Sequence, residues 1–432
     1  MSFIGFPKID FKVEGMELVA LPRMMKIRQK YDTQRITGIE AHITAQMENN
    51  LNNPEQYKGK RLCITAGSRG IPHLALIIRT IAGKLKTWGA EPFVIPAMGS
   101  HGGATAEGQR ELIAAYGITE ENVGAPIFSS MEVVQIGELT DGMPIYCDKY
   151  AYESDGIVVL NKVKPHSNFR GKYESGMAKM LSIGLAKHKG ASLFHMKGYD
   201  TFPERIRQVC ETFLERAPIA FGVGIVQNAY DEISSIEIMG KEMILGKDAE
   251  LLETAKSKIA AFKFPHIDVL IIDEIGKNVS GNGHDPNITG RSGYPGFENV
   301  VSIQKMFVRG LNKETNHNAC GLARADITTR RCLNSVDFAA TWVNLVTAAS
   351  LSGGAMPMYA ENDREAILIA IRTCVGADFE YGKAKVVRIK DTLHMEEIEV
   401  SESYYDEIKN NPEIGILSGP YEMQFDQDGF LL

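Results

Sequence analysis

Two histidines stand in loop-like segments, each directly after a short apolar run. His101 lies in the glycine-rich segment 99–103, and His166 lies in the segment VKPHSNF. Imidazole titrates near neutral pH, which suits it to take up and return a proton. An acid and a base on opposite faces of one carbon could invert its configuration. The alternatives are a phosphate-binding glycine loop with His101 as a bystander, and two histidines with unrelated roles.

A lysine, Lys179, lies within the apolar, small-residue segment 175–185. Burying an ammonium group is costly, and burial lowers the pKa of a lysine and makes its amine nucleophilic. The alternative is a lysine whose stem crosses apolar surface while its amine reaches solvent. His195 follows at 195 − 179 = 16 residues. A lone histidine is more often a structural residue than a metal ligand.

Charged residues in three places could bind an anionic substrate. Arg69 lies in the turn Gly-Ser-Arg-Gly, and a guanidinium there could hold a carboxylate through two parallel hydrogen bonds. Glu274 and Lys277 are three residues apart after another apolar run and could reach across a domain cleft. Solvated surface charges are the simpler interpretation of each.

Short apolar runs alternate with amphipathic stretches along most of the chain. The runs predict buried strands at Leu62–Thr65, Phe93–Ile95, Gly156–Leu160, Ile219–Val226 and Asp268–Ile272. Helical patterns cover Leu74–Trp88, Thr105–Tyr116 and Asp248–Phe262. This alternation predicts an α/β fold, in which loops after parallel strands gather at one rim of the sheet. Arg69, His101 and His166 would share that rim.

The chain has 432 residues, which favours two domains. We expect a boundary near Pro265, with domains of residues 1–264 and 265–432. Between Lys277 and Gly296 the many Gly, Asn, Ser and Pro residues predict a long loop without regular structure.

Composition excludes several classes of protein. A net charge of −7 argues against nucleic acid or an anionic membrane as the main partner. The six cysteines are scattered without a C-x-x-C pair, which disfavours a zinc ribbon or a common iron–sulfur motif and favours reduced thiols. No apolar run approaches the roughly 20 residues of a membrane helix, and no signal peptide is evident. We expect a cytoplasmic protein.

These motifs, taken in order, resemble those of the nickel-dependent lactate racemases. Arg69 matches an arginine in the first strand-end loop of that family, and the segment 99–101 matches a Gly-Thr-His-like loop. His166, the segment 176–179 and His195 match a histidine, a glycine-rich stretch ending in lysine, and a histidine 16 residues further on.

The resemblance implies two α/β domains with Rossmann-like parallel sheets and an active site in the interdomain cleft. It implies a racemase or epimerase of a small 2-hydroxy acid. Hydride would pass reversibly to a nickel-pincer nucleotide, through a 2-keto acid. Enzymes that synthesise the cofactor would be partners.

Each matching residue takes a role from the resemblance. Lys179 would hold the nucleotide through a thioamide, and His195 would ligate nickel. His101 and His166 would exchange the hydroxyl proton. The remaining positions would bind substrate (Arg69, Glu274 and Lys277) or cofactor (Gly99, Ser100, Gly102 and Gly176).

The chain departs from the family pattern at several positions. Ala66 stands where an aspartate is usual, and Glu274 stands where the family has an amide, so we expect a hydroxy acid other than lactate or a polyol acid. The interval from His166 to Lys179 is longer than in the family, which makes Lys172 a second candidate for the covalent lysine. Other classes stay open: a nicotinamide-dependent oxidoreductase, although no G-x-G-x-x-G follows the first strand, or a non-catalytic nucleotide- or hydroxyacid-binding protein.

Overall fold

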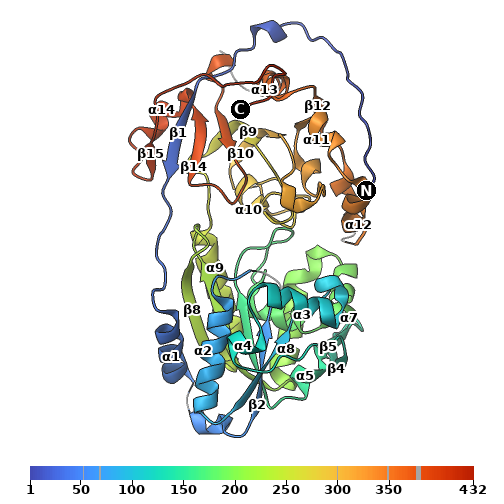
Figure 1. Ribbon diagram of the computed structural model, residues 1–432, viewed down its shortest axis with the longest axis vertical. Helices are drawn as coiled ribbons and strands as arrows, with labels where there is room; N and C mark the ends of the chain where they lie inside the picture. Colours follow the sequence, from blue (N-terminus) through green and yellow to red (C-terminus); the bar gives the residue numbers. More distant parts are fainter. Residues whose placement is uncertain (52, 68–69, 299, 348–349, 376–380) are drawn as a thin grey trace. The chain divides into compact units, whose positions relative to one another are not determined.

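The computed structural model divides the chain into two compact units. One unit comprises residues 32–259, and the other combines residues 1–31 with residues 260–432 (Figure 1). The structure describes residues 1–51, 53–67, 70–298, 300–347, 350–375 and 381–432. This division differs from the expected one, because the first 31 residues join the C-terminal part of the chain and the second boundary precedes Pro265.

The unit of residues 32–259 is built on a five-stranded sheet. In spatial order its strands are β3 (Glu91–Pro96), β2 (Arg61–Ala66), β6 (Gly156–Lys162), β7 (Ile219–Gln227) and β8 (Ile233–Gly240). The first four strands are parallel and β8 is antiparallel to β7. A hairpin is formed by β4 (Val133–Glu138) and β5 (Pro144–Asp148).

Helices cover both faces of this sheet. They are α1 (Ile39–Asn50), α2 (Leu74–Thr87), α3 (Ala106–Ala115), α4 (Glu120–Val123), α5 (Lys149–Tyr152), α6 (Gly176–Lys179), α7 (Lys187–Met196), α8 (Phe202–Arg216) and α9 (Ile244–Lys258). Successive residues of β6 enter opposite cores: Val158 and Leu160 pack on the side of α1 and α2, and Ile157 and Val159 on the side of α8. The continuous apolar run therefore marks a strand buried on both faces, as expected.

The second unit contains an eight-stranded sheet that includes a strand from the N-terminal segment. In spatial order the strands are β12 (Met358–Ala360), β11 (Ile327–Thr329), β10 (Ser302–Val308), β9 (His266–Ile272), β13 (Val386–Ile389), β14 (Glu397–Ser401), β1 (Met24–Gln29) and β15 (Ile414–Ile416). The blue β1 lies beside the red and orange strands β14 and β15 in Figure 1, and pairs with both.

This second sheet is parallel from β12 to β13 and antiparallel from β13 to β15. Its unit also contains the helices α10 (Pro286–Thr289), α11 (Arg330–Asn334), α12 (Phe338–Thr347), α13 (Asp363–Arg372) and α14 (Tyr405–Ile408). Both sheets are thus mixed and parallel-rich, which confirms the expected α/β fold with parallel sheets in both parts of the chain. The expected cleft between the units stays a prediction.

The strand predictions are confirmed, since each of the five apolar runs falls within a strand. The predicted helix Asp248–Phe262 begins and ends four residues earlier. The segment from Lys277 to Gly296 is not wholly irregular, because it contains the one-turn helix α10. The Asp285 side chain caps that turn, Pro286 begins it and Gly290 ends it at a positive φ of 67°.

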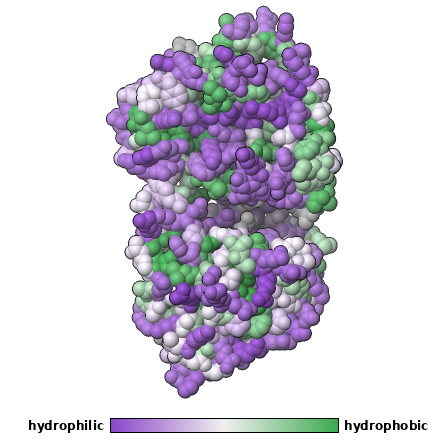
Figure 2. Space-filling view, in the orientation of Figure 1, coloured by the Kyte–Doolittle hydropathy of each residue, from purple (hydrophilic) through white to green (hydrophobic). Residues whose placement is uncertain are grey.

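The cysteines and the surface have the properties that the composition predicts for a protein with reduced thiols and many polar residues. All six cysteines are buried and free. On the face shown in Figure 2, hydrophilic residues surround smaller apolar areas. Within the described residues no helix is long and apolar enough to cross a membrane.

Candidate functional site

Three neighbouring parallel strands end next to the predicted site residues. The chain leaves β3 five residues before His101 and leaves β6 four residues before His166. The strand between them, β2, ends at Ala66, and Arg69 lies outside the described residues. Because carboxyl ends of parallel strands share one edge, the two histidine loops start from the same edge of the sheet.

Aromatic side chains bring His166, Lys179 and His195 together. The His166 ring packs against the Phe169 ring at an interplanar angle of 30°, with centroids 4.4 Å apart. The Lys179 ammonium lies 5.8 Å from the centroid of the Phe169 ring. Tyr199 lies 5.6 Å from the His195 ring and 6.2 Å from the His166 ring. Three functional groups from the loop after β6, from α6 and from α7 thus border one aromatic cluster.

The aromatic cluster consists of Phe169, Tyr199 and Phe202. Its ring centroids are 4.7 to 6.1 Å apart. Aromatic rings with little conformational freedom give a rigid, largely apolar wall. Sequence reasoning missed these residues, although the spacing of Tyr199 and Phe202, four and seven residues after His195, was a usable signal.

His195 is held as a neutral imidazole with one nitrogen available. Burial, and then the nearby charge of Lys179, lower the pKa of His195 below its ordinary value. Its Nδ1 atom is buried and has no hydrogen-bond partner among the described residues. An unpaired buried nitrogen costs free energy unless a ligand uses it, and metals bind neutral imidazole. A metal ion or cofactor at Nδ1 would therefore satisfy this atom.

Lys179 ends a helical turn whose start is fixed by a buried carboxylate. Asp248 of α9 accepts hydrogen bonds from the backbone N–H groups of Met177 (2.8 Å) and Ala178 (3.2 Å). Gly176 has a φ of +84°, and a Cβ atom there would lie 2.2 Å from Asp248 Oδ1. The position therefore requires glycine for a structural reason, beside the cofactor contact that we expected of it.

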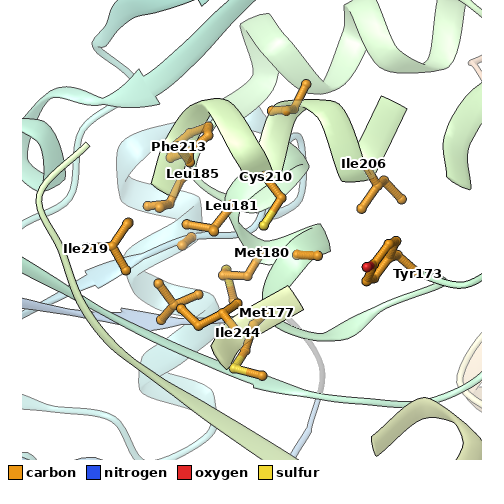
Figure 3. Packing of buried hydrophobic residues seen from close by; sticks show 14 of the residues in the cluster. Tyr173, Met177, Met180, Leu181, Leu185, Ile206, Cys210, Phe213, Ile219 and Ile244 are labelled. Atoms are coloured by element: carbon orange, nitrogen blue, oxygen red, sulfur yellow. The ribbon is translucent and has the colours of Figure 1, made fainter. Parts of the chain in front are cut away.

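The segment after Lys179 is also buried. A π-helical turn, Met180–Gly184, follows α6, and such turns frequently occur at functional sites. Figure 3 shows Met180 and Leu181 packed among side chains that include Cys210 and Phe213 of α8. Lys179 is therefore carried by a backbone with little freedom. Lys172, the second candidate, is exposed, and its ammonium lies 5.7 Å from the ring centroid of Tyr173.

Hydrogen bonds connect the His101 loop to the same helical segment. Gly99 donates its N–H to the carbonyl of Gly184 (3.1 Å), and a Cβ atom on Gly99 would lie 3.2 Å from Ala191 of α7. The Gln109 amide donates to the carbonyls of Gly99 (2.9 Å) and His101 (3.2 Å). The imidazole of His101 and the side chain of Ser100 are exposed, while Gly99 is buried and Gly102 has a φ of +63°.

A buried ion pair is connected to this loop through Gln109. Lys187, the first residue of α7, is fully buried and lies 3.0 Å from the equally buried carboxylate of Asp148. Lys187 also donates to the side-chain oxygen of Gln109 (3.3 Å). Burial raises the pKa of Asp148, although Lys187 opposes that shift. The His101 loop and the helix that carries His195 therefore share one polar network.

The two candidates in the other unit have separate partners. Glu274 lies 3.7 Å from the ammonium group of Lys390, and Lys277 donates a hydrogen bond to Asn344 of α12. Neither contact identifies a ligand, so their substrate-binding role stays a prediction. In the described parts of the chain, no group of three or more His, Cys, Asp or Glu residues could hold a metal ion on its own.

The chain is similar to a known protein family and to solved structures. Residues 9–202 match the family described as the lactate racemase N-terminal domain. The lactate racemase apoprotein of Thermoanaerobacterium thermosaccharolyticum is 15% identical, with a TM-score of 0.49, over 91% of this chain and 99% of that one. A Thermotoga maritima protein is 16% identical, with a TM-score of 0.46, over 64% and 71%. No curated protein matches the chain.

Proposed function

Through residues 9–202 this chain belongs to the lactate racemase family, and from that membership we propose that it is a racemase or epimerase of a 2-hydroxy acid that uses a nickel-pincer nucleotide. The observation that carries the proposal is the convergence of His166, Lys179 and His195 on one aromatic cluster. These three residues are the ones that the family pattern assigns to proton exchange, cofactor attachment and nickel ligation.

The residues present fit such a cofactor. The Nδ1 atom of His195, which has no partner among the described residues, would offer nickel a neutral imidazole ligand, and the nearby Lys179 amine would form the thioamide. When bound, the cofactor supplies a reversible acceptor for the hydrogen on the substrate's C2 atom. The aromatic cluster would exclude water from that side of the site.

The chain's own residues would then exchange the proton of the substrate hydroxyl group and bind the substrate carboxylate. His166 and His101 would take up and return the proton of the substrate hydroxyl group, and Arg69 would hold the carboxylate. A flat 2-keto acid held by these groups can regain hydrogen on either face, which inverts the centre. Ala66 and Glu274 favour a substrate other than lactate, and Lys277 would add a positive charge for its carboxylate.

Cofactor attachment can be tested by mass. The protein is produced with and without the cofactor-synthesis enzymes, which we propose as its partners, and its intact mass and nickel content are measured. We expect an adduct and bound nickel in wild-type protein, neither in Lys179→Ala, and both in the matched control Lys172→Ala. Unmodified, nickel-free wild-type protein under these conditions would contradict the proposal.

Activity is tested on the loaded protein with a panel of enantiopure 2-hydroxy and polyhydroxy acids. Chiral separation of each product should show conversion of at least one substrate to its stereoisomer. Loaded protein that inverts none of them would favour a binding role instead.

A further inference from the structure

A fully buried carboxylate lies in the loop between His166 and Lys179. Glu174 has no exposed surface, although it belongs to a loop rather than to a helix or strand. Carboxylates are rarely fully buried unless cations and hydrogen-bond donors surround them. The partners of Glu174 therefore indicate what it stabilises.

The backbone of the loop supplies the first two partners. The N–H of His166 donates to Glu174 Oε2 (2.9 Å), and the N–H of Gly171 donates to Oε1 (3.2 Å). Gly171 in turn lies against α8, where a Cβ atom would be 2.4 Å from the Cβ of Pro203. Glu174 thereby draws the segment 166–171 into a closed turn against the core.

Two cations compensate the charge of Glu174. Arg170 lies 3.4 Å from Oε2, and Lys256 of α9 lies 3.1 Å from Oε1. Lys256 also forms an ion pair with Glu253, whose side chain is 74% exposed. The same helix holds the start of α6 through Asp248, eight residues before Lys256. One face of α9 thus anchors both ends of the segment from His166 to Lys179.

The closed turn also sets the state of the His166 ring. The N–H of Asn168 donates to His166 Nδ1 (3.0 Å), which requires Nδ1 to be without a proton. The neutral ring then carries its proton on Nε2. Phe169, the next residue, packs against the His166 ring. Ring orientation and tautomer therefore depend on the turn that Glu174 closes.

We propose that Glu174, paired with Lys256, is the positioning residue that holds His166 in one orientation and one tautomer for proton exchange. The proposal rests on the proposed function, because it assigns Glu174 to the proton-exchanging histidine. Glu174 accepts a hydrogen bond from the backbone N–H of His166, so we expect it to act on the ring through the backbone of the turn.

The first test uses the cofactor-free full-length chain. Nitrogen NMR of ¹⁵N-histidine-labelled protein, with the His166 signals assigned from His166→Gln, reports the tautomer at pH 8. We expect the Nε2–H form in wild type and in the control Glu253→Gln, and a mixture of tautomers in Glu174→Ala. Glu174→Gln keeps the shape of the side chain and one acceptor oxygen, so it should change the tautomer ratio less than Glu174→Ala does. If the alanine variant does not fold, the glutamine variant is the one compared with wild type.

The second test uses the cofactor-loaded enzyme. We expect Glu174→Ala to lower kcat about a hundredfold, as expected for a misplaced proton-exchanging group, with KM and the Lys179 adduct unchanged. Glu253→Gln should retain wild-type kcat. An unchanged His166 tautomer in the Glu174 variants that fold would overturn the positioning role.

The two proposals fail in different ways. If the wild-type protein takes up no cofactor or inverts no hydroxy acid, the proposed function fails, while the NMR experiment still decides whether Glu174 fixes the ring. If wild type is active and both Glu174 variants keep its kcat, only the positioning role is overturned.

Discussion

At the scale of single residues, the most informative atoms are two buried histidine nitrogens that have no hydrogen-bond partner among the residues the structure describes. His195 Nδ1 lies beside the aromatic cluster, and His284 Nε2 lies in the other unit. The two atoms have different surroundings. His195 is only partly buried and has Lys179 nearby, whereas His284 is fully buried and its Nδ1 lies 3.1 Å from the hydroxyl of Thr289. Their chemistry should differ accordingly.

We predict that His195→Ala separates nickel binding from cofactor attachment. The variant removes the imidazole ligand but leaves Lys179, so the covalent adduct should persist while nickel per adduct falls about tenfold or more. Metal analysis together with intact mass measures both quantities. Full nickel retention would show that His195 is not a ligand.

The stability of the chain should depend on pH through His284. Burial lowers the pKa of His284 to about 4, so the folded state binds fewer protons than the unfolded state between that value and its ordinary pKa near 6.5. Its contribution is present above about pH 6.5 and is lost as pH falls toward 4. At pH 5 the loss should reach about 2 kcal/mol.

Urea unfolding at pH 7 and pH 5 measures this loss. It is read from tryptophan fluorescence in a Trp88→Phe background, where the remaining tryptophan, Trp342, lies in the same unit as His284. The variant His284→Gln cannot titrate, so its stability should change less between the two pH values. An equal change in wild type and variant would mean that other groups cause the acid sensitivity.

At the scale of elements, a short helical turn carries the candidate cofactor lysine, Lys179, and a side chain distant in the sequence fixes the start of that turn. Asp248 caps α6, and its own burial raises the pKa of its carboxyl group to about 7. The α/β character and the five strands were predictable, because short continuous apolar runs that alternate with amphipathic stretches are typical of buried parallel strands. The cap was not predictable, because Asp248 and Gly176 are 72 residues apart and meet only when α9 packs against α6.

We predict that Gly176→Ala destabilises the protein and reduces loading of Lys179. The new Cβ atom would collide with Asp248, and alanine would have to adopt a positive φ, which together cost about 2 to 4 kcal/mol. Thermal unfolding and the fraction of adduct by intact mass are the measurements. The matched control is Gly246→Ala in α9, where a Cβ atom meets nothing within 4 Å, and it should be neutral or slightly stabilising.

At the scale of the whole molecule, the N-terminal segment belongs to the sheet formed by the C-terminal part of the chain. Met24, Met25 and Ile27 of β1 are buried there, and β1 pairs with β14 and β15 on its two sides. A fragment of residues 32–259 retains the five-stranded sheet complete. A fragment of residues 260–432 would expose the edges of β14 and β15 and the apolar surface that β1 covers.

We therefore predict that the two fragments behave differently. Residues 32–259 should fold cooperatively alone, and residues 260–432 should aggregate unless residues 1–31 are joined to them. Circular dichroism during thermal unfolding, with size-exclusion chromatography, tests both statements. A monomeric, cooperatively folded fragment of residues 260–432 would contradict the structural role of β1.

The sequence alone determined the α/β class, the buried strands and the ordered set His101, His166, Lys179 and His195, since apolar runs and motif intervals are local properties of the chain. Tertiary structure decided the rest. It placed β1 in the distant sheet, gathered the aromatic cluster around three of those residues, and put Glu174 and Asp248 against backbone N–H groups. These contacts join residues far apart in the chain or depend on how a loop closes, so no local pattern specifies them.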